Sequence, residues 1–226
     1  MPAGTDRLAP ALATDATVER VWLDDTSWVD VSRGWLENQQ QLYDAAVDGV
    51  AWTENRIFRY DRWVPEPRLY GGWKVGDPAV DPVVVEAHRA LQHRYRVQFG
   101  GFAWAWYRDG SDSVAFHRDR EMRWLDDTII AILTLGTKRS FQVRPRANRY
   151  GHDDATRGAI HDLAPAGGDL LVMGGTCQAK WEHSVPKVDP RIGGRISMQW
   201  RWTSRRGRME QGGSYSSPRR YGDRSR

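Results

Sequence analysis

His117 and Asp119 lie two residues apart in the segment Ser113-Val-Ala-Phe-His-Arg-Asp119, whose apolar and β-branched residues are typical of a strand. Because side chains alternate between the two faces of a strand, His117 and Asp119 would point to one side and Arg118 to the other. A second histidine from a neighbouring strand would complete the facial triad of non-haem iron oxygenases. By itself the His-x-Asp pair is a weak signal, since it recurs by chance on polar surfaces.

The third ligand would have to come from the other five histidines. His88 and His93 lie in a segment with helical character, where a surface or internally hydrogen-bonded histidine is the simpler interpretation. His152 and His161 flank a polar loop, and His183 follows an apolar run and precedes a proline-bearing turn. Spacing alone does not choose among these last three.

A second chemical signal lies in the strand-like residues 195–202. The two-residue period of a strand puts four polar side chains on one face: Arg195, Ser197, Gln199 and Arg201. Burying two arginines is costly without a partner, and a carboxylate is the partner that a guanidinium binds best. A dicarboxylate cosubstrate would connect both observations, with one end on the metal and the other on an arginine. A solvent-facing edge strand is the competing interpretation.

The elements that would position these residues are helices followed by many short strands. We predict one helix over residues 32–47 and another from Asp81, where a capping residue precedes proline at the first helical position. Short β-type runs separated by turn residues follow, at 102–107, 113–117, 128–135, 140–145, 169–173 and 195–202. This order favours an α+β fold built around a β-sandwich or barrel.

Length and composition favour one domain. The chain has 226 residues, of which 40% are hydrophobic and 27% charged, and no apolar run approaches the roughly 20 residues that span a bilayer. We expect a flexible leader over residues 1–20 without the pattern of a signal peptide, a domain over 21–203 and a tail over 204–226. The single cysteine, Cys177, excludes an intramolecular disulfide and fits a reducing cytoplasm.

The positive charge of the chain lies in this tail. Seven arginines follow Thr203 against two acidic residues, whereas the rest of the chain is near neutral. A segment of this composition cannot bury enough apolar surface to fold alone. It is either a solvated terminus or a sequence-independent contact with nucleic-acid phosphates.

The ordered combination of these motifs resembles the AlkB family of alkylation-repair dioxygenases over about residues 65–205. The resemblance is carried by residues 107–121, 129–136, 168–186 and 195–201. It implies a double-stranded β-helix, or jelly-roll, core with N-terminal helices and a nucleotide-recognition lid, the lid and first metal motif covering about residues 60–127. It implies iron(II), 2-oxoglutarate and O2, and oxidative demethylation of bases such as 1-methyladenine and 3-methylcytosine in DNA or RNA. Succinate, carbon dioxide and formaldehyde would be released.

The resemblance also implies roles for individual residues. The iron ligands would be His117, Asp119 and His183. The cosubstrate residues would be Tyr107, Arg195, Ser197 and Arg201. The substrate contacts would be Tyr70, Trp73 and Glu121. Ala105 and Ser197 depart from the family pattern, which often has asparagines at these positions, and this implies weaker or compensating cosubstrate contacts.

We therefore expect a cytoplasmic, monomeric enzyme that acts on nucleic acid and is not associated with a membrane. Two other functions stay open. One is a hydroxylase of a protein or small metabolite with the same iron and 2-oxoglutarate chemistry. The other is a catalytically weak nucleic-acid-binding module, which Ala105, Ser197 and the basic tail suggest.

Overall fold

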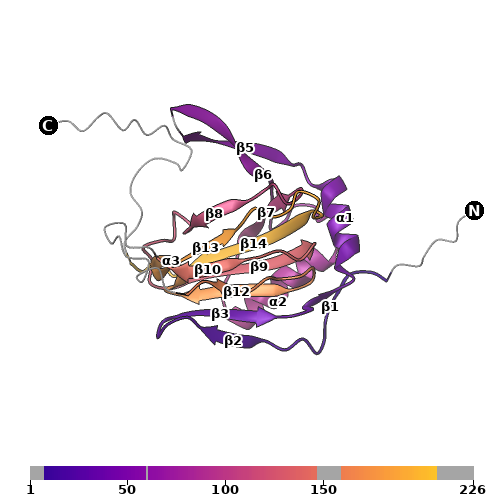
Figure 1. Cartoon of the computed structure of the whole chain (residues 1–226). Helices are drawn as coiled ribbons and strands as arrows, with labels where there is room; N and C mark the ends of the chain where they lie inside the picture. The colour runs from indigo at the N-terminus through magenta and orange to yellow at the C-terminus, as the bar shows by residue number, and fades with distance from the viewer. Residues whose placement is uncertain (1–7, 60, 147–158, 208–226) are drawn as a thin grey trace, which may run out of the picture.

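Two antiparallel sheets form the body of the protein (Figure 1) in a computed structural model that describes residues 8–59, 61–146 and 159–207. The larger sheet has the strand order β2 (Glu19–Trp22), β3 (Ser27–Ser32), β12 (Leu170–Gly175), β9 (Thr128–Gly136), β14 (Arg195–Thr203), β7 (Gly101–Tyr107), β6 (Arg62–Lys74) and β5 (Thr53–Arg59). The smaller sheet has the order β11 (His161–Asp162), β10 (Gln142–Pro145), β13 (Trp181–Val185) and β8 (Val114–His117). A short pair joins β1 (Ala11–Leu12) to β4 (Leu36–Glu37), and the described helices are α1 (Gln39–Gly49), α2 (Val83–Tyr95) and α3 (Cys177–Lys180).

The chain crosses between the two sheets from β7 onward. Strands β7, β9, β12 and β14 belong to the larger sheet, and β8, β10, β11 and β13, which lie between them in the sequence, belong to the smaller one. This back-and-forth order with antiparallel pairing is consistent with the expected jelly-roll. The two sheets therefore face each other across a space, and the strands of the two sheets lie on opposite sides of it.

Strand β9 is buried on both faces and divides the core into two parts. Ile129, Ala131 and Leu133 point to the face that α1 and α2 cover, whereas Ile130 and Ile132 point into the space between the sheets. A strand buried on both sides needs a continuous apolar sequence, which Thr-Ile-Ile-Ala-Ile-Leu-Thr-Leu provides. The larger apolar cluster lies on the helix-covered face of the sheet. The polar side chains that could do chemistry lie on the other face, in the space between the sheets.

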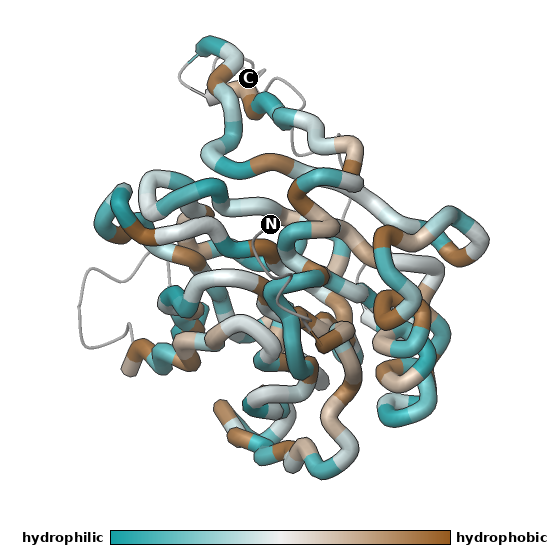
Figure 2. The backbone as a smooth tube through the Cα atoms, turned by 90° about the vertical axis from the view of Figure 1, so that its right-hand side faces the viewer, coloured by the Kyte–Doolittle hydropathy of each residue, from teal (hydrophilic) through white to brown (hydrophobic). Residues whose placement is uncertain are grey.

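The β5–β6 hairpin extends beyond the rest of the described chain in both views (Figures 1 and 2). Figure 2 shows hydrophobic residues among hydrophilic ones along it. Its second strand runs away from the tip and, at its far end, pairs with β7, with Leu69 opposite Trp106 and Trp73 opposite Phe102. The hairpin therefore has a long arm anchored in the larger sheet and an end that projects from it.

The second predicted helix and the six predicted strand runs are confirmed. The helix is α2, and the runs correspond to β7, β8, β9, β10, β12 and β14. None of the helices in the described part of the chain is long and apolar enough to cross a membrane. Cys177 is a free, buried thiol.

The expectations for the N-terminal region need correction. Residues 11–12 and 19–22 form strands where a flexible leader was expected, and residues 1–7 lie outside the described chain. The helix expected over 32–47 begins only at Gln39, because Gly34 adopts a left-handed φ of 61° and the Leu36 amide donates to the carbonyl of Gly168 at 2.9 Å. This contact ties the segment to the sheet instead of letting it coil.

Candidate metal and cosubstrate site

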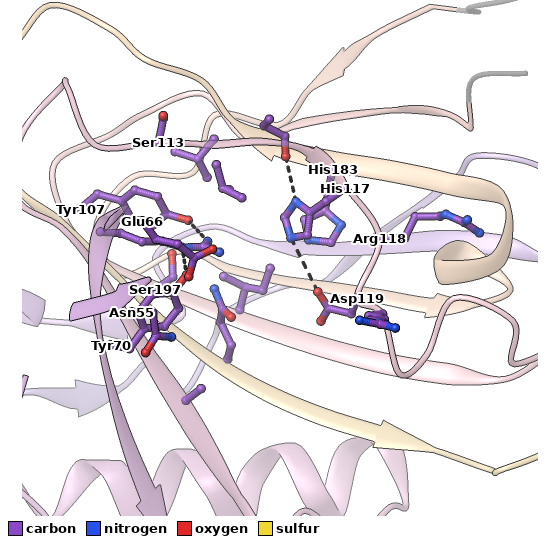
Figure 3. Close-up of a pocket in the computed structure, with 18 of the residues that line it drawn as sticks. Asn55, Glu66, Tyr70, Tyr107, Ser113, His117, Arg118, Asp119, His183 and Ser197 are labelled. Carbon is purple, nitrogen blue, oxygen red and sulfur yellow. Dashed lines mark hydrogen bonds and ion pairs between the residues drawn. The ribbon is translucent and has the colours of Figure 1, made fainter. Parts of the chain in front are cut away.

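A cavity of about 670 Å³ lies between the two sheets (Figure 3). Its wall includes side chains from β5, β6, β8, β9, β13 and β14, together with the segment that follows β8. Of the residues predicted to do chemistry, the cavity brings together Tyr70, Tyr107, His117, Asp119, Glu121, His183, Ser197 and Arg201. Arg195 lies next to this group, fully buried beside Tyr107.

His117, Asp119 and His183 turn toward one another, as Figure 3 shows. His117 and His183 are register partners on β8 and β13, with ring centroids 4.3 Å apart. His117 Nε2 lies 3.7 Å from Asp119 Oδ1. One ligand atom from each residue falls within 4.8 Å of the others, a spacing that fits a single metal ion. In the described residues this is the one group of histidine, cysteine and carboxylate side chains with that property.

The two imidazoles are oriented by their surroundings. His117 donates a hydrogen bond from Nδ1 to the carbonyl of Ala115 at 2.9 Å, which leaves Nε2 as the metal-facing nitrogen. His183 stacks on Phe141, with ring centroids 5.6 Å apart and an angle of 18° between the planes. Both rings are therefore fixed before any ion binds.

Asp119 is held by polar contacts from distant parts of the chain. Arg201 Nε donates to Asp119 Oδ2 at 2.6 Å, and the Asp119 amide donates to Gln178 Oε1 at 2.9 Å. Burial would raise the pKa of Asp119, but the positive charge of Arg201 and its hydrogen bond to the carboxylate prevail and hold that pKa below its usual range. The carboxyl is therefore an anion at neutral pH.

The histidines are neutral in the same conditions. Burial, together with the neighbouring His117, lowers the pKa of His183 to about 3. Burial also lowers the pKa of His117, although the Asp119 carboxylate opposes this effect. Neutral imidazoles and an ionised carboxylate are the protonation states that a divalent metal requires of its ligands.

Arg195 has the environment of an anion-binding residue. Its side chain is 0% exposed, its Nη2 donates to Thr134 Oγ1 at 3.4 Å, and its Nε and Nη1 have no hydrogen-bond partner among the residues that the structure describes. Burial lowers its pKa to about 10, so it remains a cation at neutral pH. A buried guanidinium with open donors fits a ligand carboxylate.

The polar face of β14 connects this arginine to the metal ligands. Arg195 lies at one end of the strand and Arg201 at the other, with Ser197 between them at 1% exposure. Arg201 Nη2 also donates to Gln199 Oε1 at 2.6 Å. The opposite face of β14 packs into the helix-covered core through Ile196, Met198 and Trp200, as the two-residue period predicts.

Strand β6 contributes a chain of hydrogen bonds that was not predicted from the sequence. Arg68 Nη1 donates to Tyr107 Oη at 2.9 Å, Arg68 Nε also donates to Tyr70 Oη, and Tyr70 Oη donates to Glu66 Oε2 at 2.6 Å. Glu66, Arg68 and Tyr70 all line the cavity. The period of two from Glu66 to Tyr70 could have placed Glu66 and Arg68 beside Tyr70.

Trp73 does not lie at the site. It is 7% exposed and stacks on Phe102 in the helix-covered core, with centroids 5.4 Å apart. The reason is again the strand period, because three steps from Tyr70 lead to the opposite face of β6. Tyr70 and Glu121, the other two substrate contacts that the resemblance implies, do line the cavity.

Of the other histidines that the structure describes, none lines the cavity. His88 is buried and accepts a hydrogen bond from Trp200 Nε1 at 3.2 Å, in line with the simpler interpretation of that residue. His93 is exposed on α2, and His161 packs near Trp181 on the smaller sheet. His152 lies outside the described residues.

Comparison with known proteins agrees with this geometry. The model of the 2OG-Fe(II) oxygenase superfamily matches residues 86–215, more than half of the chain. Alpha-ketoglutarate-dependent dioxygenase alkB homolog 3 of Mus musculus is 28% identical over 163 residues, which are 67% of this chain and 57% of that protein. DNA oxidative demethylase ALKBH2 of Homo sapiens is 32% identical over 95 residues, 42% of this chain and 36% of that protein. A 2OG-Fe(II) oxygenase family structure from Burkholderia pseudomallei is 13% identical, with a TM-score of 0.49 over 76% of this chain and 82% of that one.

The superfamily match contains all three candidate metal ligands and the whole polar face of β14. This chain spans less than two thirds of the length of the curated relatives that it matches. The expected enzyme class is confirmed, and so are iron(II), 2-oxoglutarate and O2 as the cofactor and cosubstrates of the family. The chain belongs to the 2OG-Fe(II) oxygenase superfamily, and its similarity to alkB homolog 3 and ALKBH2 supports a place within it among the AlkB dioxygenases.

Proposed function

We propose that this protein oxidatively removes methyl groups from N-alkylated bases of nucleic acid, such as 1-methyladenine and 3-methylcytosine. The observation that supports this most is the meeting of three features in one cavity. These are the His117–Asp119–His183 group, the arginine face of β14 and the polar face of β6. The names of the relatives, a dioxygenase and a DNA oxidative demethylase, point to the same substrate class.

In this proposal His117, Asp119 and His183 hold iron(II), and Arg195 with Tyr107 binds the far carboxylate of 2-oxoglutarate. Ser197 lies between the two ends, and Arg201 lies near the metal-proximal end. When bound, iron and 2-oxoglutarate supply, with O2, the oxidising power to hydroxylate a methyl C–H bond, while 2-oxoglutarate becomes succinate and carbon dioxide. The hydroxymethyl group then leaves the base nitrogen as formaldehyde.

The chain itself positions the reactants and excludes water. Arg201 keeps the Asp119 carboxylate ionised, and Phe141 keeps the His183 ring in one orientation. Burial of Arg195 removes the water that would otherwise solvate its charge, so the charge is available to the cosubstrate. A methylated base has to leave the helical stack to reach such an interior site.

The cavity offers an aromatic ring and carboxylates to a base that carries positive charge, as 1-methyladenine and 3-methylcytosine do at neutral pH. Tyr70 offers an aromatic ring in the cavity, and aromatic stacking is worth about 1–3 kcal/mol per base. Glu66 of β6 and Glu121 of the turn after β8 add carboxylates to the same cavity. We propose Tyr70 and Glu121 as substrate contacts, with Glu66 holding the Tyr70 hydroxyl.

The basic tail is proposed to contact phosphates. Arg205 and Arg206 are exposed at the end of the described chain, and residues 208–226 lie outside it. Each phosphate neutralised by an arginine steepens the salt dependence of binding. Deletion of residues 208–226 should therefore weaken binding to an oligonucleotide and flatten its dependence on salt. An unchanged slope would contradict a role for the tail.

A substrate panel tests the proposed function. The full chain with iron(II), 2-oxoglutarate and ascorbate should release formaldehyde from oligonucleotides that carry 1-methyladenine or 3-methylcytosine, and not from unmodified ones. Single-stranded DNA, duplex DNA and RNA of one sequence would rank the polymers. Succinate without formaldehyde from any methylated oligonucleotide would overturn demethylation and favour a hydroxylase of another substrate. Oligonucleotide binding without succinate would favour a catalytically weak binding module.

A further inference from the structure

Asp119 lies in a stretch of chain that the sheet does not hold. Strand β8 ends at His117, and it is the edge strand of the smaller sheet, paired with β13. His117 is therefore fixed by its register with His183, whereas residues 118 and 119 have no regular structure and residues 120–124 form a turn that starts with the bond from the Met122 amide to the Asp119 carbonyl. A carboxylate that ligates a metal from a turn needs another group to set its position.

The side chain of Gln178 contacts the backbone of Asp119. Gln178 belongs to α3, the short helix between β12 and β13, and its side chain is 1% exposed. Its Oε1 accepts the hydrogen bond of the Asp119 amide at 2.9 Å, across 59 residues of sequence. The next residue, Ala179, accepts a hydrogen bond through its carbonyl from Arg118 Nη1 at 3.1 Å. Helix α3 thus holds the metal-ligand turn at two successive residues.

The side-chain amide of Gln178 does not make all the hydrogen bonds that it could make. Its Nε2 is buried and has no hydrogen-bond partner among the described residues. A buried donor without a partner destabilises a folded protein, so stability alone does not explain an amide at this position. The contact that it does make is to the backbone of a candidate metal ligand, and the chain continues from α3 directly into β13, which carries His183.

We propose that Gln178 is a positioning residue for the metal site, a role that rests on the proposed ligand set. Gln178 fixes the backbone of Asp119, and Arg201 fixes one oxygen of its carboxylate. The other oxygen is left facing His117. Because α3 leads into β13, one short element sets the distance between Asp119 and His183.

Manganese(II) binding to the apo protein tests this role without turnover. Gln178→Met keeps the length of the side chain and removes the acceptor. We expect it to weaken Mn²⁺ binding, followed by the electron paramagnetic resonance signal of the free ion, by about 10–100-fold. Gln178→Glu keeps an acceptor oxygen at this position and should recover much of the affinity.

Gln92→Met is the matched control. Gln92 Oε1 accepts the Phe99 amide at 2.8 Å, the same type of contact, but on α2 and away from the cavity. We expect it to lower the thermal unfolding temperature of the apo protein without changing its Mn²⁺ affinity. Gln178→Asn, which draws the amide back by one methylene, replaces the methionine variant if that variant does not fold.

The outcomes distinguish the positioning role of Gln178 from the proposed set of metal ligands. Native Mn²⁺ affinity in Gln178→Met, or an equal loss of affinity in Gln92→Met, would overturn the positioning role. Failure of Gln178→Glu to bind better than Gln178→Met would also overturn it. Asp119→Ala is measured in parallel, because undiminished Mn²⁺ binding by that variant would overturn the ligand set itself.

Discussion

Replacement of Arg195 by methionine should make the apo protein more stable while it abolishes the response to cosubstrate. Burial lowers the pKa of Arg195 from 12.5 to about 10, and each unit corresponds to about 1.4 kcal/mol, so its charge costs the apo fold about 3 kcal/mol. Methionine carries no charge and leaves no guanidinium donor unpaired. In a chain of this size a change of 1 kcal/mol shifts the unfolding temperature by about 2–4 °C. A rise of several degrees is expected, reduced by any loss of packing.

Addition of 2-oxoglutarate should then raise the unfolding temperature of the native chain but not that of Arg195→Met. Loss of one partner of a buried ion pair costs about 3–5 kcal/mol, which is roughly two to four orders of magnitude in affinity. Thermal unfolding with Mn²⁺ and increasing 2-oxoglutarate measures both effects. Arg139→Met is the control: Arg139 is also buried, but it donates to the carbonyls of Asp109, Asp112 and Pro186, so its loss should destabilise the apo protein. An Arg195→Met variant that is less stable than the native chain, and still stabilised by 2-oxoglutarate, would refute the reasoning.

Three further changes test other parts of the account. Tyr70→Ala should raise the KM for a methylated oligonucleotide through the loss of about 1–3 kcal/mol of stacking, and an unchanged KM would exclude Tyr70 from the base site. Trp73→Phe should lower the unfolding temperature and leave that KM unchanged, because Trp73 packs in the core; a selective rise in KM would contradict this placement. Burial and the nearby Arg89 lower the pKa of His88, so its contribution to stability is present above about pH 6.5 and is lost as the pH falls toward its folded pKa. His88→Asn should accordingly make the unfolding temperature less sensitive to acidification between about pH 7.5 and 5.5 than in the native chain, and equal sensitivity would contradict the assignment.

The face of β14 could be predicted from the sequence because strand alternation is a local property. Arg195 and Arg201 lie on the side away from Ile196, Met198 and Trp200, as the period requires. Helix α2 could also be predicted from the sequence, because Asp81 and Pro82 mark its start. In the structure Asp81 Oδ1 accepts a hydrogen bond from the Val83 amide at 2.9 Å. Both features depend on neighbours within a few residues.

Asp119 lies beside His117 as the sequence predicts, but the strand period is not what places it there. Strand alternation was expected to place it beside His117, but β8 ends at His117 and a turn carries Asp119. Its position depends on Gln178 and Arg201, which lie 59 and 82 residues away in the sequence. Contacts over such separations cannot be inferred from spacing in a single sequence.

The β5–β6 hairpin was missed because its sequence is unfavourable for a strand. Pro65, Pro67, Gly71 and Gly72 lie within β6, and proline and glycine are depleted in strands. Pairing with β7 and burial of Trp73 against Phe102 override this preference. Trp73 was expected at the site because of the family resemblance, and without a recognised strand its face could not be assigned from the sequence.

The most direct test of the central claim is the joint measurement of succinate and formaldehyde from an oligonucleotide that carries 1-methyladenine, with the native chain and with Asp119→Ala. Asp119 is buried beside both histidines and has no role in the helix-covered core, so its loss should remove the metal site. The native chain should release equal amounts of succinate and formaldehyde, and the variant neither product above background. Demethylation by Asp119→Ala at the native rate would show that Asp119 does not hold the catalytic metal.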